Sequence, residues 1–243
     1  MLQGLYSAAS SMDSADLQHA IISRNLAHAN VPGFRRMLVH QQTSGSSGSG
    51  QSGDASDQGQ GEAKIAVDFK PGAIQQTGRG LDLALMGDGF FSVNGPNGPL
   101  YTRNGSFHIN PEGTLVTTEG LPVRDDGGSP IQIPNTASEM EVAISEGGQV
   151  MVKGRSVGVI GRYAFPDPNV LVSQGTTLFE APPDVTPSSI DTQVGTGMQE
   201  GSNVVPATEL VLMISGMRQY EAAQRMMQSI GTALRERIQL EGK

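Results

Sequence analysis

Apolar and polar residues follow a helical period at both ends of the chain and a strand-like period between them. In the stretch 206–240, apolar residues recur every three to four positions, and no proline follows Pro206. An apolar row with a period of about 3.5 residues is typical of a helix packed lengthwise against another helix. At about 1.5 Å per residue, such a helix would be roughly 50 Å long. An ordinary core helix has a similar pattern, so that alternative stays open here.

The start of the chain carries a matching pattern. Residues 2–29 are expected to form a helix that ends near Asn30, because Pro32 disfavours the helical conformation at Val31. We therefore predict that the two terminal helices form a coiled-coil-like pair. The residues expected at its seam are Leu5, Met12, Ile22 and Leu26 in the first helix and Leu210, Met213, Met217, Tyr220, Met227 and Leu234 in the last.

From Lys64 onward the pattern changes to short segments separated by turn residues. Asn94-Gly95, Asn97-Gly98 and Asn104-Gly105 are hairpin signals, because both residue types tolerate a positive φ. Regular spacing without a helical pattern predicts an all-β module, with prolines 182, 183 and 187 at its exit. The expected strands are 65–69, 81–86, 90–93, 100–103, 106–109, 114–117, 131–133, 140–144, 149–152, 157–165 and 177–180.

Between the first helix and the β module lies the tract 43–61, which consists almost entirely of Ser, Gly, Gln and Asp. It cannot bury enough apolar surface to offset the entropy of ordering, so we expect a mobile loop. The predicted fold class is a mainly β central module with long N- and C-terminal α-helices. The expected domains are 1–42 with the first helix and the residues that close it, the loop 43–61, the β-rich middle 62–198, and 199–243 with the last helix.

Composition and charge exclude several classes of function. The net charge of −8 and a pI near 4.9 argue against binding to nucleic acid. The absence of Cys excludes disulfides and thiol chemistry. No stretch approaches the roughly 18 apolar residues of a membrane span. The first nine residues lack the basic start and apolar block of a cleavable secretory signal, so we expect neither membrane insertion nor cleavage.

Candidate chemistry is sparse. The four histidines, at positions 19, 28, 40 and 108, form no i, i+4 pair that would indicate zinc. Asp125 and Asp126 precede two glycines, which is typical of a turn rather than of paired catalytic carboxylates. No nucleophile–base pair or phosphate loop stands out. We therefore expect no enzyme activity, no catalytic residues, no cofactor and no metal.

The segment that closes the first helix, residues 23–35, reads Ser-Arg-Asn-Leu-Ala-His-Ala-Asn-Val-Pro-Gly-Phe-Arg. It resembles a motif of the flagellar rod and hook family. Stretches 81–84, 87–91, 101–107 and 200–204 are similar to the same family, in the same order. Arg24, His28 and Val31 depart from the usual residues of the motif. The positions that match it are Ser23, Asn25, Leu26, Ala27, Asn30, Pro32, Gly33 and Phe34.

The resemblance implies a structural subunit of the bacterial flagellar basal-body rod, part of the axial drive shaft that crosses the periplasm. Such subunits leave through the flagellar type III export apparatus without cleavage. They assemble with copies of themselves and with other rod and hook subunits, and their terminal helices pair inside the rod. The seam residues above would then belong to assembly surfaces. Chain length and the Glu-Gly-Ser-Asn stretch at 200–203 favour the proximal-rod subgroup over the distal-rod subgroup.

Two other functions fit the same layout. The β-rich middle could be a binding module of the cell envelope, with the helices as a dimerisation stalk. Less in keeping with the sequence, the middle could hold a hydrolase site. A stalked module would form a discrete oligomer, whereas a rod subunit would make open, helical contacts. A hydrolase would show a pocket with perturbed titratable groups.

Overall fold

The structure is a computed structural model that describes residues 2–41, 63–134 and 139–241. The side chains of residues 2–6, 41, 63, 234 and 236–241 are outside this description. The tract 43–61, expected to be a mobile loop, also lies outside the described residues.

The chain divides into two compact units. Unit 1 comprises Met1–Ala27, Met37–Asp68 and Val205–Lys243, and unit 2 comprises His28–Arg36 and Phe69–Val204. The segment 28–36, which was expected to belong with the first helix, is therefore part of the β-rich unit. As a result, the chain passes between the units at four points rather than two.

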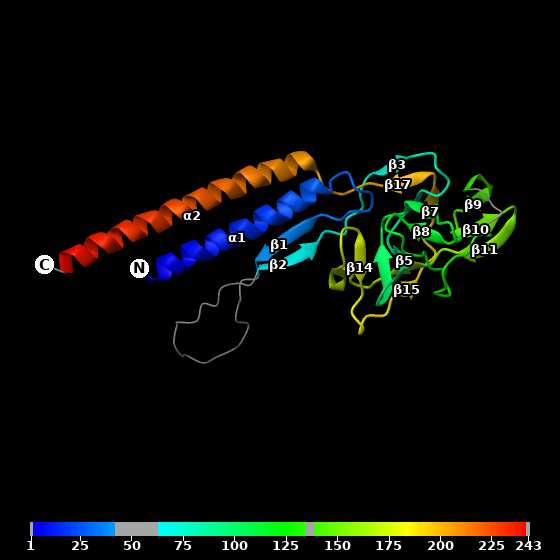
Figure 1. The fold of residues 1–243 in the computed structure, drawn as a ribbon, viewed down its shortest axis with the longest axis horizontal. Helices are drawn as coiled ribbons and strands as arrows, with labels where there is room; N and C mark the ends of the chain where they lie inside the picture. The colour runs from blue at the N-terminus through cyan, green and yellow to red at the C-terminus, as the bar shows by residue number, and fades with distance from the viewer. Residues whose placement is uncertain (1, 42–62, 135–138, 242–243) are drawn as a thin grey trace. The chain divides into compact units, whose positions relative to one another are not determined.

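Unit 1 contains the two terminal helices, α1 (Leu2–Ala27) and α2 (Pro206–Glu241). They lie side by side and run in opposite directions (Figure 1), which confirms the predicted pairing. The first helix ends two residues earlier than expected, because the Val31 N–H donates to the His28 carbonyl in a turn. The described part of the unit also contains two strands that pair antiparallel, β1 (Met37–Gln41) and β2 (Ala63–Val67), with β1 against α1.

Unit 2 is built from antiparallel strands. Its largest sheet has the order β13 (Val172–Ser173), β14 (Leu178–Glu180), β6 (Gly98–Thr102), β5 (Phe90–Gly95), β12 (Arg162–Ala164) and β15 (Ser188–Ser189). A second sheet has the order β11 (Arg155–Val159), β10 (Gln149–Val152) and β9 (Val142–Ile144). The remaining strands form the pairs β16 (Val194–Thr196) with β4 (Leu83–Leu85), β17 (Met198–Glu200) with β3 (Ile74–Gln76), and β7 (Phe107–Ile109) with β8 (Leu115–Thr117).

One hydrophobic core joins these sheets. Phe91, Val93, Phe107, Leu115 and Val150 come from three different sheets, and none of them has exposed surface. The Phe91 and Phe107 rings meet edge to face, with centroids 5.3 Å apart, an arrangement that aromatic pairs favour. The predicted mainly β middle is thus confirmed as a packed unit with its own core.

The Asn-Gly signals were right at one place and wrong at another. β5 and β6 form the expected hairpin, with Gly95 opposite Gly98 across a two-residue turn. Asn104-Gly105 was expected to make a hairpin as well, but β6 pairs with β5 and β14 while β7 pairs with β8. The Asn104 side chain instead accepts a hydrogen bond from the Ser106 N–H, and this turn carries the chain from one sheet to another.

Several expected strands differ in extent. The stretch 157–165 is two strands in different sheets, because Ile160 and Gly161 leave the ladder to pair with the segment at Asp125. The stretch 131–133 makes only an isolated bridge, and 140–144 begins with the 3₁₀ turn η1 (Glu139–Glu141). A further 3₁₀ turn, η2 (Pro168–Val170), was not expected. The β module also continues past its expected proline-marked exit, through β15, β16 and β17, to Glu200.

The packing of unit 2 gives a matched test of burial. Val150 in β10 has 0% of its surface exposed, whereas Val172 in β13 has 55% exposed. Val150→Ala should lower the free energy of unfolding by about 2 kcal/mol, since each buried carbon lost costs about 0.8 kcal/mol and leaves a void. Val172→Ala should change it by less than about 0.5 kcal/mol. Calorimetric unfolding of the full chain measures both. Equal effects would contradict the assigned core.

Candidate assembly site

One face of α1 forms the seam with α2. Ala8, Ala15 and Ile22 are buried, and Met12 and Leu26 beside them are half-buried. These residues recur every three to four positions, so they share one side of the helix. The alanines allow the partner helix to approach closely. Of the expected seam residues of α1, Ile22 is therefore buried and Met12 and Leu26 are half-buried, while the side chain of Leu5 is outside the described residues.

The matching face of α2 consists of two interleaved rows. Met213, Tyr220 and Met227, all expected at the seam, are half-buried. The companion row in the helix pair is Glu209, Gly216 and Ala223, which are buried. Glycine and alanine in this row are a signal too weak to find from hydrophobicity alone.

The other expected row of α2 lies to one side of the helix pair. Leu210 and Met217 have 47% and 52% of their surface exposed, and Ile214 between them has 54%. The spacing of four and three residues places all three on one side of α2. The side chain of Leu234 is outside the described residues. The helix pair therefore leaves an apolar strip, Leu210, Ile214 and Met217, facing water.

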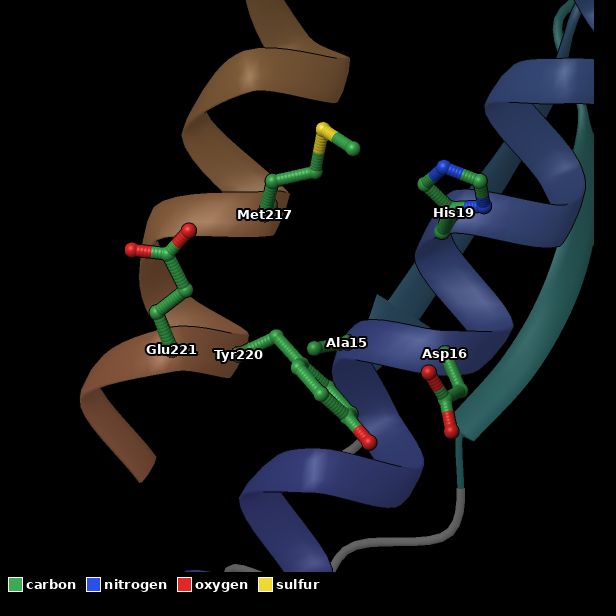
Figure 2. A pocket seen from close by; sticks show the side chains of 7 residues that line it. Ala15, Asp16, His19, Met217, Tyr220 and Glu221 are labelled. Atoms are coloured by element: carbon green, nitrogen blue, oxygen red, sulfur yellow. The ribbon is translucent and has the colours of Figure 1, made fainter. Parts of the chain in front are cut away.

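A groove of about 260 Å³ runs between the helices beside this strip. Figure 2 shows Met217 of α2 and His19 of α1 facing each other across it, and Tyr220 reaching toward α1 near Ala15. Ala15 and Gly216 line it with a small side chain or none, which leaves this space between the helices unfilled. Asp16 and Glu221 add carboxylates at its edge. The groove has the size and lining to receive one or two side chains of another helix.

Asn25 fixes β1 against both helices. Its side chain is 1% exposed; Oδ1 accepts from the Met37 N–H at 2.9 Å, and Nδ2 donates to the Met37 carbonyl at 2.9 Å. Nδ2 also donates to Glu209 Oε2 of α2 at 3.2 Å. A polar residue inside a helix is satisfied here by three groups from two other elements. This accounts for an asparagine at this motif position.

The rest of the motif lies partly at the end of α1 and partly in unit 2. Phe34 has no exposed surface, and Gly33 is buried with φ +71°, a conformation that favours glycine. The Gly33 N–H donates to the Glu200 carbonyl at 2.8 Å. Among the others, Leu26, Ser23 and Pro32 are half-buried and Ala27 and Asn30 exposed.

Three charged side chains meet inside unit 2 next to the motif. Arg35 Nη2 lies 2.6 Å from Glu200 Oε1, and Arg103 Nη1 lies 3.3 Å from Glu200 Oε2. The three side chains are 0%, 6% and 1% exposed for Arg35, Arg103 and Glu200. Burial lowers the pKa of the Arg103 guanidinium from its usual value, and the Glu200 carboxylate opposes that shift. Arg103 also lies 5.5 Å from the Phe90 ring centre, a favourable position for a cation.

These charged residues lie in the stretches whose sequence resembles the rod and hook family, but the sequence did not indicate that they form a site. Arg35 is followed by a second arginine, Arg36, and nothing in their order shows which one is buried. Glu200 and Glu209 likewise look like ordinary surface carboxylates in a glycine-rich exit and a helix start. The available signal for a buried charge was its neighbours, Gly and Phe, because such residues are typical of places where backbone packs closely.

Sites for chemistry other than assembly are few. An open depression of about 450 Å³ in unit 2 is lined by the polar residues Arg79, Asp82, Ser106, His108, Thr118 and Gln199. Arg79 is already paired there with Asp82 at 2.9 Å. Asp125 makes the predicted turn, accepting hydrogen bonds from the N–H groups of Gly128 and Ser129. Among the described residues there is no metal-binding cluster of His, Asp and Glu. The described helices include none that is long and apolar enough to span a membrane.

Comparison with known proteins points in one direction. A family described as the flagellar hook protein FlgE/F/G D1 domain matches residues 84–152, and one described as the flagellar basal body rod FlgEFG protein C-terminal matches residues 196–240. The chain is 33% identical to the flagellar basal-body rod protein FlgF of Caulobacter vibrioides, over 92% of this chain and 91% of the relative. It is 30% identical to FlgF of Rhizobium meliloti, over 100% of this chain and 99% of the relative. It is 31% identical to FlgG of Bacillus subtilis, over 99% of each.

Gly33 offers a direct test of the motif's packing. A Cβ added there would lie 2.3 Å from the Asn104 nitrogen, whereas a Cβ at Gly78, with a similar φ of +75°, would meet nothing within 4 Å. Both Gly→Ala changes carry the cost of a positive φ, about 1–2 kcal/mol. Gly33→Ala should destabilise unit 2 by about 1–3 kcal/mol more than Gly78→Ala, because backbone must move. Thermal unfolding of the two variants compares them. If they lose the same stability, segment 28–36 is not packed as described.

Proposed function

The chain belongs to the flagellar basal-body rod FlgE/F/G family, and on this premise we propose that it polymerises through the helix pair of unit 1. It is a subunit of the basal-body rod and not an enzyme. The observation that carries the proposal is the apolar strip of Leu210, Ile214 and Met217 beside the groove at Gly216. The partners proposed for it are helices of other copies of this chain and of other rod and hook subunits.

Physical reasons favour this strip as a contact. Three neighbouring large apolar side chains, each about half exposed, are more than the scattered apolar residues normal on a surface. Burying them against another helix would gain about 25 cal/mol for each Å² removed from water. The strip and the groove lie next to each other, so a partner helix on the strip can also insert a side chain into the groove. Tyr220 and Met217 would then contact α1 on one side and the neighbour on the other.

Within the family, we propose the FlgF type. Both FlgF and FlgG relatives match the full chain, so the choice rests on the gaps in the alignments. The alignment with FlgF of Rhizobium meliloti spans 245 positions for this chain of 243 residues, whereas that with FlgG of Bacillus subtilis spans 264. The FlgF comparison therefore needs far fewer insertions. This agrees with the proximal-rod expectation from the Glu-Gly-Ser-Asn stretch.

We also propose that the subunit reaches the rod through the flagellar export apparatus without loss of its N-terminal segment. The support is structural: Ala8, Ala15 and Ile22 of α1 form half of the seam with α2. Removal of residues up to about position 20 would leave α2 without most of its partner. An assembled subunit thus needs the whole first helix.

Mass analysis of basal bodies tests the uncleaved form. The subunit extracted from assembled rods should retain the N-terminal segment, beginning at residue 1 or 2. The same measurement on the protein purified from the cytoplasm serves as the reference. A rod-derived form that begins near residue 20 would contradict the proposed role of α1.

A pair of lysine substitutions tests the strip. Ile214→Lys places a charge on it, whereas Ser215→Lys places the same charge one position along, on another exposed side of α2. Neither residue is buried, so the free energy of unfolding of the subunit should change by less than about 0.5 kcal/mol in both variants. Ile214→Lys should abolish or strongly reduce rod assembly and swimming, because a charge enters an apolar contact. The strain carrying Ser215→Lys should swim like the wild type.

Basal bodies isolated from the two strains, together with thermal unfolding of the purified variants, separate assembly from folding. If Ile214→Lys assembles as well as Ser215→Lys, the strip does not face a neighbour. If Ile214→Lys unfolds the helix pair, the residue belongs to the subunit's own core.

A further inference from the structure

Three of the four points at which the chain passes between the units share one feature. The passages lie at residues 27–28, 36–37, 68–69 and 204–205. At 36–37, 68–69 and 204–205, nearby residues of unit 2 are hydrogen-bonded to one another, since Arg36 and Lys70 both bond to Asn203. These three connections therefore start from the same place within unit 2, although they are far apart in sequence.

Two side chains near the last passage make most of these bonds. Glu200 Oε1 binds Arg35 at 2.6 Å and accepts from the Gly72 N–H at 2.9 Å, while its carbonyl accepts from Gly33. Asn203 Oδ1 accepts from the Arg36 N–H at 2.7 Å, and its Nδ2 donates to the Lys70 carbonyl at 3.0 Å. We call this set, Gly33, Arg35, Arg36, Lys70, Gly72, Glu200 and Asn203, the collar.

The collar is closely packed as well as charged. A Cβ at Gly72 would lie 2.0 Å from the Gly201 carbonyl oxygen, so only glycine fits there. Arg35 and Glu200 are both fully enclosed, and a buried charge is tolerated only when a partner is present. Arg35 and Glu200 are separated by 165 positions in sequence. Segment 28–36 can therefore pack on unit 2 only when residue 200 is in place.

We propose that the Arg35–Glu200 contact is a closure latch for the collar, and that Arg35 and Glu200 are positioning residues for segment 28–36. When the latch is closed, segment 28–36 is held on unit 2, and the connections at 36–37, 68–69 and 204–205 leave from the collar. When it is open, the segment becomes a free connector between α1 and β1, and two of the four connections are released. This inference goes beyond the proposed rod function and does not depend on it.

Two substitutions of the same kind distinguish a latch from general stabilisation. Arg35→Gln removes the contact from segment 28–36 but leaves Glu200 paired with Arg103. Arg103→Gln removes the other guanidinium and leaves the latch closed, with Arg35 at 2.6 Å. The purified full-length chain is digested briefly with trypsin, and cleavage after Arg36 is followed by mass spectrometry. That site remains in both variants, and Asn203 and Glu200 hold it in the closed form.

Arg35→Gln should raise the rate of cleavage after Arg36 at least about tenfold over wild type, because trypsin can cleave the segment only when it is open. The thermal transition of unit 2 should persist. Arg103→Gln should leave this cleavage rate within about twofold of wild type. Glu200→Gln, which removes the partner itself, should release the site at least as much as Arg35→Gln.

Each other outcome contradicts the latch. Unchanged cleavage in Arg35→Gln would show that the contact does not hold the segment. Equal release in Arg103→Gln would show that the whole charged cluster acts as ordinary core. Loss of the entire unit 2 transition in Arg35→Gln would show that the segment is inseparable from the fold and is no latch.

Discussion

The enclosed carboxylate of Glu200 is the constraint on which the arrangement of unit 2 depends. It binds the side chain of Arg35, the side chain of Arg103 and the backbone of Gly72, which come from three separate parts of the chain. Removing one partner of a buried ion pair typically costs about 3–5 kcal/mol, although the pair itself adds little net stability. The carboxylate therefore acts mainly by disfavouring arrangements in which these segments are apart. Gly33 and Gly72 are glycines because that gathering brings backbone against backbone.

The helix unit follows a different principle. Most of the stability of a helix in a protein comes from packing its apolar face, and α1 supplies such a face for only part of α2. The pair buries Ala15, Ile22 and Ala223 but leaves Leu210, Ile214 and Met217 in water. A subunit that forms a polymer needs two kinds of apolar surface. One is buried within the chain, and the other becomes buried only on assembly. The hydrogen bonds from Asn25 to Glu209 and to β1 set the register of α1 against α2, which is the surface buried within the chain.

The sequence predicted the parts of the fold that depend on periodicity. Both helices, the mainly β middle and the β5–β6 hairpin follow from residue spacing. The buried Gly216 and Ala223 of α2 were missed because close approach between helices selects small residues, which carry no hydrophobic signal. The buried Glu209 was missed because it looks like an ordinary surface carboxylate. The Asn104-Gly105 hairpin was wrong because an Asx turn uses the same residues to change sheets. Arg35 and Glu200 were beyond sequence reasoning, since only the fold reveals that two charges 165 positions apart share one buried site.

Hydrogen exchange of the wild-type full-length chain, measured amide by amide at increasing denaturant, tests the central claim most directly. If the enclosed Glu200 carboxylate holds segment 28–36 on unit 2, the amides of Gly33 and Phe34 should be protected well above an exposed turn. They should open at a lower free energy than core amides such as that of Val150, and with a smaller dependence on denaturant. Amides of Gly33 and Phe34 that exchange as fast as an exposed turn, while the core stays protected, would contradict it.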